Sequence, residues 1–452
     1  MVSTRGIGVL AGSFAVGAIM FLAPCRAQSE QLKHTCVPVG MKGGKANWAL
    51  FNSPICTHRG VVFIAFVGPN PRDGTGYQTV VGKLADGKWQ FSVVEPNNLN
   101  DPWHAQPSLV VDAAGHVHVT YNMHSSPWQY CVSLRPADIR RWVFRGQKLR
   151  GPHDRLESGV VYGEGRAAIP GNRITYQFMT TDRNGVPYVI FREALKNLPG
   201  TDYFKMQWSL GIARYDARQR KWLRVGPGRG VRVFATEPGR RVQGGRVYFD
   251  PNNRMHVSWI WYAEYEKDGS GHLKPNWPGY AYSDDCGTTF HRADGKPLKL
   301  PVRLADVPKV ISPDWLEPTE KGYFAAYTEL CASPHGVPYL WVEPKAPRKG
   351  RHRAIIQYLK DKGWNEPMLT PYAASRFTVD SKGRLTAISS GICVHRSHDS
   401  GRTWQHHTVP GSRSSMIWLD YAYSLHSDGV RFLAMENETG ELKVYTVEIS
   451  AE

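Results

Sequence analysis

Cysteine is scarce in this chain, with 7 residues in 452. Cys25 lies in an apolar N-terminal segment, and the spacings of the other six show neither a CxxC metal knuckle nor a disulfide framework. We therefore expect most of the six to be small buried residues. They are Cys36, Cys56, Cys131, Cys286, Cys331 and Cys393.

Long apolar runs are missing beyond the N-terminus. Residues 6–24 carry no charge, follow Arg5, and precede Cys25-Arg26-Ala27, which resembles a small-residue cleavage site. This pattern predicts a signal peptide over residues 1–27 and a secreted or periplasmic protein, with a retained membrane anchor as the alternative. No later stretch is apolar enough to span a bilayer, so we expect no stable membrane association after cleavage.

Blocks of lysine and arginine typical of nucleic-acid binding are also missing, although the chain carries a net charge of +17. An exported basic protein is expected to meet an anionic ligand. We therefore expect an acidic polysaccharide or oligosaccharide as the partner, and no nucleic acid. A basic surface that serves only solubility is the alternative, and the protein is expected to be a monomer.

Helical periodicity is nearly absent, and a short unit recurs instead. Each copy has a turn with Gly or Asn and then a strand in which apolar residues alternate. Seven copies predict an all-β fold, a seven-bladed β-propeller that forms a single domain over residues 28–452. The terminal strands are expected to share a blade, because ring closure removes open edges. The copies cover residues 58–66, 114–121, 184–191, 253–259, 335–341, 382–388 and 428–434.

A second repeated pattern agrees with this fold. Ser283–Phe290 and Ser397–Trp404 both read S-x-D-x-G-x-T-aromatic, which is the Asp-box of sialidase-like and related propellers. The Asp and Thr of such a box cap a hairpin turn, so Asp285 and Asp399 are expected to be structural. His116 and His118 alternate with valines and are also expected to be structural. Four of the seven repeated turns follow an Asp: Asp112, Asp182, Asp250 and Asp380.

Pairs of acidic residues suited to two-carboxylate hydrolysis do not stand out at the predicted strand ends. Histidine, tyrosine and arginine stand there instead. His104 precedes and His124 follows a predicted hairpin, and antiparallel strands return both to one edge of the sheet. In the next blade Tyr176 begins the inner strand and Arg192 ends the return strand, so all four are expected at one face of the ring.

These four residue types together predict proton abstraction next to a sugar carboxylate. Arg192 and His124 are expected to bind and neutralise the carboxylate, which stabilises the developing charge. His104 and Tyr176 are expected to move protons as base and acid. A free tyrosine has a pKa of about 10, and nearby positive charge lowers it. The expected reaction is β-elimination without a cofactor. The alternative is that these residues are hydrogen-bonded surface groups, which a lone histidine at a strand end more often is.

Two further arginines lie on the predicted inner strand of the following blade. Arg241 and Arg246 come shortly before Asp250 and next to the proposed site. They are candidates for binding another acidic or sulfated sugar. Ordinary solvated arginines near a loop are the alternative.

The chain resembles the BNR-repeat propellers that include ulvan lyases and L-rhamnose-α-1,4-D-glucuronate lyases. The resemblance is carried mainly by Pro107-Ser-Leu-Val-Val-Asp-x-x-Gly-x-x-His-Val and by Asn122-Met-His-Ser-Ser-Pro127. It implies a secreted lyase that cleaves a rhamnose–glucuronate linkage, with His104 and Tyr176 as catalytic residues and His124 and Arg192 at the carboxylate. It also implies that a structural zinc or calcium can occur, with Cys286 and Cys393 as weak candidate ligands and the metal site unknown.

Three functions remain open at this point. The first is the lyase, the second is a rhamnosidase-like or sialidase-like hydrolase, and the third is a non-catalytic carbohydrate-binding propeller. The sequence leaves open the sulfation of the glycan, endo or exo action, and which residue is base and which is acid. The long gap between His124 and Tyr176 predicts an enlarged loop near residues 150–166 that shapes the substrate cleft.

Overall fold

The computed structural model describes residues 32–44, 51–74, 76–94, 106–126, 128–146, 174–194, 208–226, 234–235, 241–262, 277–312, 329–342, 354–370, 374–410, 412 and 414–449. The expected signal peptide, the expected loop near residues 150–166 and His104 lie outside the described residues.

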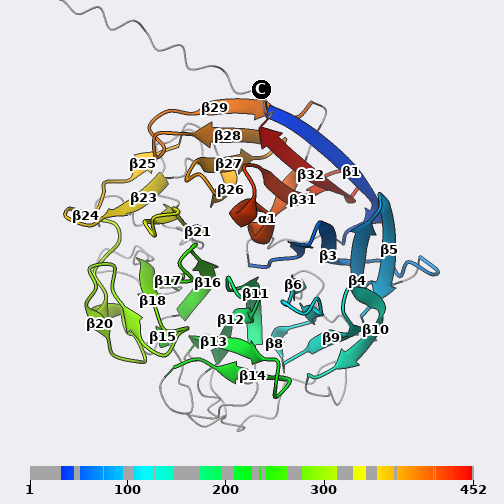
Figure 1. Cartoon of the computed structure of the whole chain (residues 1–452), viewed down its shortest axis with the longest axis horizontal. Helices are drawn as coiled ribbons and strands as arrows, with labels where there is room; N and C mark the ends of the chain where they lie inside the picture. The colour runs from blue at the N-terminus through cyan, green and yellow to red at the C-terminus, as the bar shows by residue number, and fades with distance from the viewer. Residues whose placement is uncertain are drawn as a thin grey trace, which may run out of the picture.

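Seven antiparallel sheets are arranged around a centre, which confirms the all-β seven-bladed propeller (Figure 1). Blade 1 contains β2 (Ile55–His58), β3 (Val61–Gly68), β4 (Gln78–Ala85) and β5 (Lys88–Val93). Blade 2 contains β6 (Ser108–Val111), β7 (Val117–Thr120), β9 (Tyr130–Arg135) and β10 (Asp138–Phe144). Blade 3 contains β11 (Ile174–Thr181), β12 (Pro187–Ala194), β13 (Trp208–Asp216) and β14 (Lys221–Arg224), with β8 (His124–Ser126) beside β11 and β15 (Phe234–Ala235) beside β13.

The remaining four blades continue the ring. Blade 4 contains β16 (Arg241–Phe249), β17 (Met255–Tyr262), β18 (Trp277–Ser283), β19 (Phe290–His291) and β20 (Pro297–Leu298). Blade 5 contains β21 (Glu329–Ala332), β22 (Pro338–Val342), β23 (Ala354–Leu359), β24 (Gly363–Trp364) and β25 (Met368–Leu369). Blade 6 contains β26 (Ala374–Val379), β27 (Leu385–Ser389), β28 (Cys393–Ser397) and β29 (Gln405–Thr408). Blade 7 contains β30 (Ser414–Leu419), β31 (Val430–Glu436), β32 (Glu441–Ile449) and β1 (Leu32–Lys42).

The repeated unit of the sequence is the second strand of each blade together with the turn before it. Those strands are β3, β7, β12, β17, β22, β27 and β31. Their residues are mostly buried on both faces, because one face packs against the preceding blade and the other against the following blade. The repeated sequence pattern therefore corresponds to the second strand of every blade.

Ring closure is achieved in blade 7, as expected. The first described strand, β1, pairs antiparallel with the last strand, β32, from Leu32 opposite Ile449 to Pro38 opposite Lys443. The two strands pair although they lie at opposite ends of the described part of the chain. This pairing removes the open edge that β32 would otherwise present.

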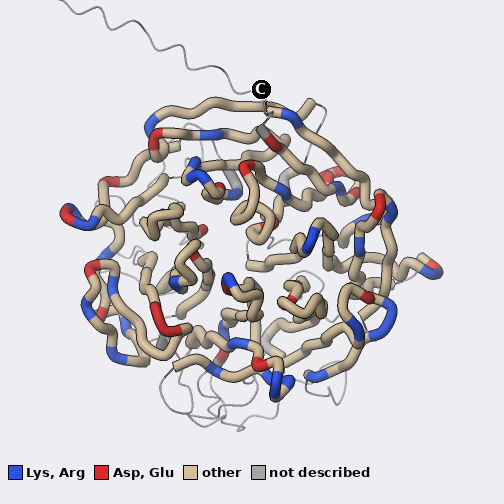
Figure 2. The backbone as a smooth tube through the Cα atoms, in the orientation of Figure 1, with Lys and Arg blue, Asp and Glu red and all other residues tan. Residues whose placement is uncertain are grey.

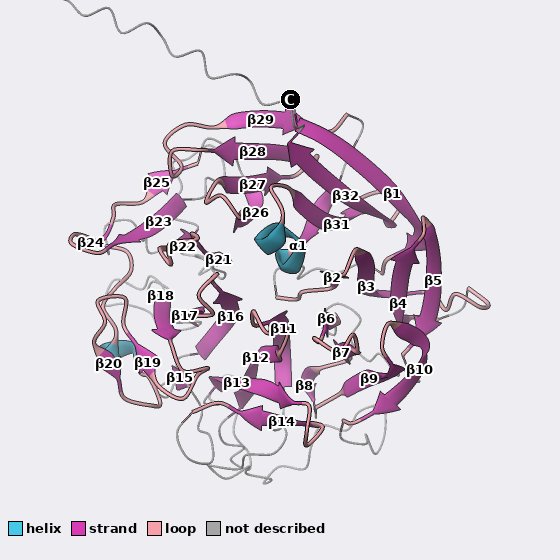
Figure 3. Cartoon of the chain, in the orientation of Figure 1, coloured by secondary structure: helices cyan, strands magenta, loops and turns pink. Residues whose placement is uncertain are grey.

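The centre of the ring contains a short helix, α1 (Tyr421–His426) (Figure 3). Asp420 caps it by accepting a hydrogen bond from the backbone N–H of Tyr423 at 3.0 Å. Asp420 also accepts a bond from the Thr57 hydroxyl in blade 1, and Tyr421 donates to Glu329 in blade 5 at 2.5 Å. The helix therefore ties distant blades together. A 3-10 turn, Leu304–Asp306, follows blade 4.

No helix among the described residues is long and apolar enough to cross a membrane.

The aspartates before the repeated turns hold those turns by a shared geometry. In blade 3 the Asp182 carboxylate accepts backbone bonds from Asn184 and Val186 at 2.9 and 2.8 Å, while Gly185 takes the left-handed φ of 72° that the turn requires. Asp250 and Asp380 accept bonds from residues two and four positions later in the same way. These carboxylates are structural.

The Asp-boxes are structural too. In blade 4 Asp285 accepts from the backbone N–H of Thr289 at 2.8 Å and from its hydroxyl at 2.7 Å, and Phe290 is fully buried. In blade 6 Asp399 makes the same two bonds with Thr403, at 2.8 and 2.6 Å. The interpretation of both carboxylates as turn caps is confirmed.

His118 is a buried structural residue, as expected from its place among valines. Its Nε2 lies 3.1 Å from an Asp112 carboxylate oxygen and its Nδ1 lies 2.6 Å from the Tyr130 hydroxyl. Burial lowers the pKa of His118, and it raises the pKa of Tyr130. Both are therefore neutral, with Tyr130 donating to Nδ1 and Nε2–H donating to the carboxylate. Blade 4 repeats this arrangement with His256, Asp250 and Tyr280.

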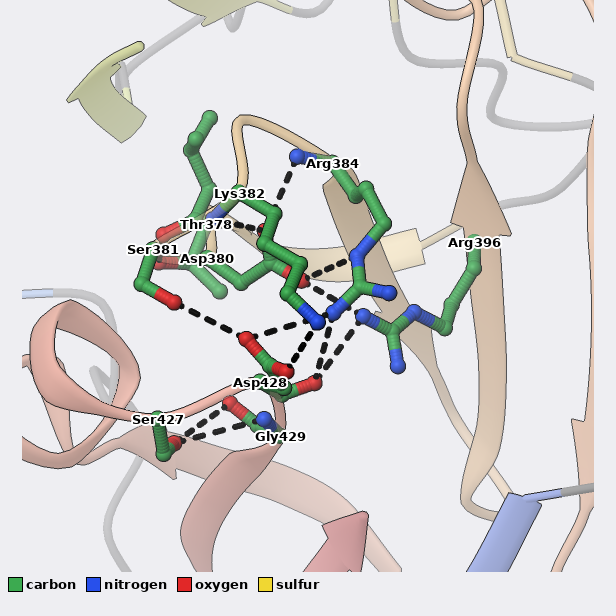
Figure 4. A network of polar contacts seen from close by, with 10 residues as sticks. Thr378, Asp380, Ser381, Lys382, Arg384, Arg396, Ser427, Asp428 and Gly429 are labelled. Atoms are coloured by element: carbon green, nitrogen blue, oxygen red, sulfur yellow. Dashed lines mark hydrogen bonds and ion pairs between the residues drawn. The ribbon is translucent and has the colours of Figure 1, made fainter. Parts of the chain in front are cut away.

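Blades 6 and 7 are joined by a charged network at their turns (Figure 4). The Asp380 carboxylate accepts from Arg384 at 2.7 Å and from Arg396 at 2.6 Å. Asp428 of blade 7 forms ion pairs with Lys382 at 2.5 Å and with Arg384 at 3.6 Å. Since Arg384 contacts both carboxylates, it links the two blades.

The cysteines are all free thiols among the described residues. Cys56, Cys131 and Cys331 are buried, as expected. Cys286 and Cys393 are partly exposed, and Cys36 is exposed on β1, the outermost strand of blade 7, so burial holds for three of the six and not for most of them.

Candidate active site on the inner strands of blade 3

The candidate site is organised by strand register. β8 pairs with β11 so that His124 lies opposite Thr175, and β11 pairs with β12 so that Thr175 lies opposite Arg192. His124 and Arg192 thus flank the start of β11 on either side, and Tyr176 is the next residue. The expectation that these residues come together is met for the three that the structure describes, while His104 lies outside the described residues.

The position of His124 differs in one respect from the sequence interpretation. It does not end the return strand of blade 2, because β7 ends at Thr120. Asn122 takes a left-handed φ of 51°, which turns the chain out of the blade 2 sheet. His124 then begins β8 and joins the sheet of blade 3, and it reaches the site by adding a strand to the neighbouring blade.

Tyr176 has an unusual backbone. Its φ is 56°, and a bulge interrupts the β11–β12 register between Thr175 and Phe178. A non-glycine residue in this region is strained by roughly 1–2 kcal/mol, and bulges next to active sites commonly redirect a side chain. The partly exposed Tyr176 ring stacks on Phe51, with 3.9 Å between ring centroids and 15° between planes. The bulge and the stacking therefore fix the direction of the phenol.

Arg192 lies behind Tyr176 and is only 2% exposed. Its guanidinium carbon is 4.6 Å from the centroid of the Tyr176 ring and 4.1 Å from that of Trp208. Its Nη1 donates to Gln243 Oε1 of blade 4 at 3.0 Å. A guanidinium stacked between aromatic rings and held by a side-chain amide has few conformations available.

His124 completes the described cluster. Its ring is partly exposed, and its centroid lies 6.5 Å from that of Tyr176. The Tyr176 ring therefore neighbours both an imidazole and a buried cation.

Arg241 and Arg246 both lie on β16, the inner strand of blade 4, as expected. The side chain of Arg241 lies outside the described residues. Arg246 is 3% exposed, its Nη2 is 3.5 Å from Glu329 Oε1, and its guanidinium lies over Phe178 at 4.7 Å. The alternative of a solvated side chain is wrong for Arg246, because it is part of a buried central network with Glu329. A sugar contact for Arg246 stays a prediction, and it would require this network to open.

Phe51, Trp208 and Gln243 are site residues that the sequence analysis did not identify. Each comes from a different part of the chain, and their contacts depend on how blades 1, 3 and 4 meet. A sequence signal exists only for Gln243, because the following Gly244-Gly245 pair within a strand indicates a bulge. The structure has that bulge between Gln243 and Arg246.

A metal site is not evident in the described part of the chain, where no three or more His, Cys, Asp and Glu side chains gather to hold an ion. Cys286 and Cys393 are partly exposed and lie in different blades, 4 and 6.

Comparison with known proteins agrees with the fold. The sequence profile of the family described as BNR repeat-containing family member matches residues 61–370. The chain belongs to this family. No curated protein sequence matches this BNR repeat-containing protein.

Solved structures with the same fold include polysaccharide lyases. An ulvan lyase of family PL25 superposes with a TM-score of 0.62 at 14% identity, covering 91% of this chain and 95% of that chain. The same lyase bound to -[GlcA(1-4)Rha3S]- gives a TM-score of 0.61. A polysaccharide lyase named Uly1 gives 0.61 at 13% identity, covering 94% of this chain and 99% of that chain. At these identities the likeness establishes the fold.

Proposed function

We propose that this BNR repeat-containing protein is a polysaccharide lyase that cleaves an acidic glycan at a rhamnose–glucuronate linkage by β-elimination. The observation that carries the proposal is the placement of Tyr176 between the buried Arg192 guanidinium and the partly exposed His124 ring. We also propose that residues 1–27 direct export, so that the enzyme meets its substrate outside the cytoplasm.

The proposed reaction removes the proton at C5 of the uronate and breaks the bond between C4 and the glycosidic oxygen. The electron pair of the C–H bond becomes the C4=C5 double bond, and the leaving oxygen takes a proton from an acid. Water is not consumed. Tyr176 and His104 are the proton carriers, and each transfer by a positioned side chain contributes about 10²–10⁴-fold to the rate.

Arg192 supplies positive charge to this reaction from behind Tyr176. Burial strengthens its field, because the surrounding medium screens little. The charge stabilises the phenolate before proton abstraction and the carboxylate-conjugated carbanion as it develops. His124, which is more exposed than Arg192, is the better placed of the two to contact the sugar carboxylate directly.

The substrate class is supported by basicity and by structural likeness. The net charge of +17 favours an anionic polymer. The superposed PL25 ulvan lyase was solved with -[GlcA(1-4)Rha3S]-, which contains both a glucuronate and a rhamnose.

Hydrolysis is the second candidate function, and a contact within blade 3 disfavours it. Glu193, the residue after Arg192, is 1% exposed and both of its oxygens accept bonds from Arg224, at 2.7 and 2.6 Å. A carboxylate held in this way is not available as a nucleophile or as a base for water. A two-carboxylate mechanism would need such a group.

Product analysis in ¹⁸O-labelled water separates the two functions. The lyase is expected to release an unsaturated sugar at the new non-reducing end, and its products carry no label when they are analysed before the new reducing end exchanges its anomeric oxygen with water. Saturated products that carry one labelled oxygen per cleaved bond would show hydrolysis and would contradict the proposal. Absence of any product from uronate-containing glycans would leave a carbohydrate-binding propeller.

A further inference from the structure

The outer strands of blades 2 and 3 border two adjoining clefts. One has a volume of about 290 Å³ and lies between the two blades, lined among others by His116, Arg145, Tyr215 and Arg220. The other has a volume of about 340 Å³ and follows the β9–β10 turn. Both clefts are lined by Leu134, which is 49% exposed, so they adjoin at this residue. We refer to the two clefts together as the basic groove.

The charges that line the basic groove are unequal. Its walls carry five arginines, all exposed: Arg135, Arg140, Arg141, Arg145 and Arg220. Two acids also line it, and each is already bonded. Asp112 accepts from His118 at 3.1 Å, and Asp138 accepts from Arg140 at 2.9 and 2.8 Å. The groove therefore offers a net positive surface after its own ion pairs are counted.

The basic groove is separate from the candidate active site. Most of its residues lie on or beside β9, β10, β13 and β14, the third and fourth strands of their blades, and the others lie in the β6–β7 turn of blade 2. Tyr176 and Arg192 lie instead on the first and second strands of blade 3. Figure 2 shows the basic tube segments at the β9–β10 and β13–β14 turns on the outer edge of the ring. The active-site proposal does not use these residues.

We propose that the basic groove is a second, non-catalytic binding site for an acidic polysaccharide, which holds a segment of the polymer by its carboxylate or sulfate groups. Two clefts in line suit successive charged sugars of one chain, and each volume lies near the lower end of the range for small-ligand sites. Arginine forks match carboxylate and sulfate oxygens in a bidentate way. Only the identity of the ligand rests on the proposed function, because the acidic polysaccharide is the substrate proposed for the active site.

A glycan fits the basic groove better than a nucleic acid does. Proteins that bind single strands combine positive charge with exposed aromatic rings on which bases stack. Two aromatic rings are among the described lining residues: Tyr215 is 8% exposed, and the partly exposed His116 is held by a contact of its Nδ1 with the Ser133 carbonyl at 3.0 Å. The exposed apolar side chain is Leu134. The groove therefore offers positive charge but little aromatic surface on which bases could stack. Such a surface suits an acidic polysaccharide better than a nucleic acid.

The test compares two charge-matched triple variants of the full mature chain. Arg135→Gln, Arg141→Gln and Arg220→Gln remove three groove charges and leave the Arg140–Asp138 pair intact. Lys88→Gln, Lys360→Gln and Lys362→Gln remove three exposed charges from blades 1 and 5. Both sets are made in a Tyr176→Phe background to keep the probe intact, and thermal unfolding confirms that both fold.

Binding of long and short oligosaccharides of the GlcA(1-4)Rha3S repeat is then measured by calorimetry. The groove variant is expected to bind the long probe about tenfold more weakly, since three exposed charge contacts are lost and each contributes modestly. The short probe cannot reach both the groove and the active site. Its affinities for the groove variant and for the control variant should therefore be equal. Equal affinities of the two triple variants for the long probe would overturn the proposal. So would groove-dependent binding of single-stranded DNA that exceeds binding of the glycan.

Affinity tests the groove proposal and unsaturated product tests the proposed function, so a failure of one can be told apart from a failure of the other. Unsaturated product is measured in parallel with the wild-type chain. A wild-type protein that forms product while the groove variant keeps full affinity contradicts only the groove. A protein that forms no product but loses affinity in the groove variant contradicts only the lyase.

Discussion

At the scale of single residues, the sequence predicts that Tyr176 and Arg192 lie close together. It does not predict that Arg192 is buried against the Tyr176 ring. A strand start and a return-strand end of one blade must lie close, because the strands are antiparallel. The burial of Arg192 depends on Trp208 from β13 and on Gln243 from blade 4, and no local pattern reports such contacts. The sequence therefore predicts a carboxylate clamp, whereas the structure places the cation behind the phenol.

Replacing Tyr176 with Phe removes one hydroxyl and keeps the stacking on Phe51. If Tyr176 carries a proton, kcat should fall by about 10²–10⁴-fold while the thermal unfolding temperature stays nearly unchanged. Tyr282→Phe is a matched control, because the Tyr282 ring also lies under an arginine, Arg254, at 4.2 Å but in blade 4. A Tyr176→Phe enzyme as active as the Tyr282→Phe control would exclude Tyr176 from the chemistry.

Replacing Arg192 with Met keeps most of the apolar volume between Tyr176 and Trp208 and removes the charge. Loss of a preorganised electrostatic group typically lowers kcat by about 10²–10³-fold. Arg192→Lys should recover part of the activity, since it restores the charge without the planar fork. Steady-state kinetics of the two variants provide the measurement. Equal losses in Met and Lys variants would point to packing and not to charge.

At the scale of elements, the sequence predicts the repeated turn in all seven blades. It predicts only some of the side-chain hydrogen bonds made at these turns and strands. Asp182 and Asp250 precede turns whose backbone N–H groups need an acceptor, which sequence chemistry anticipates. The hydroxyl partner of His118 is Tyr130, on a strand twelve residues away, and only sheet register brings it there.

The two buried histidines predict how stability depends on pH. Burial lowers the pKa of His118 and His256 below the value of about 6.5 for an unfolded chain. Below that pH the unfolded state takes up protons that the folded state does not bind, so the free energy of unfolding decreases as the pH falls. Denaturant titrations between pH 7 and pH 5 should show this decrease.

The double variant His118→Gln, His256→Gln should flatten that dependence, although its stability at pH 7 is lower because buried bonds are disturbed. The exposed His398→Gln serves as the control. An unchanged slope in the double variant would mean that the two histidines are not responsible for the loss of stability in acid.

At the scale of the whole molecule, blade number and ring closure could be predicted because both follow from repetition. The helix α1 could not, since it has six residues and its partners, Thr57 and Glu329, come from opposite parts of the ring. The boundary of a single domain at residues 28–452 stays a prediction, as does cleavage after residue 27.

Removal of β1 tests the closure of the ring. A chain that starts after Lys42 loses the partner of β32 and exposes its edge, so we expect a markedly lower unfolding temperature and aggregation. A chain that starts at Gln28 keeps β1 and should behave as the mature protein. Static light scattering during thermal unfolding compares the two. Equal stability would show that closure in blade 7 contributes little.

The ultraviolet absorbance of a C4=C5 double bond conjugated to a carboxylate tests the central claim most directly. Wild-type protein and the Tyr176→Phe variant are incubated with a rhamnose–glucuronate polysaccharide, and the absorbance is followed over time. The account predicts a steady rise with the wild type and a rise slower by at least about 100-fold with the variant. Cleavage of the polymer by the wild type without any rise in absorbance, or equal rises in both samples, would contradict it.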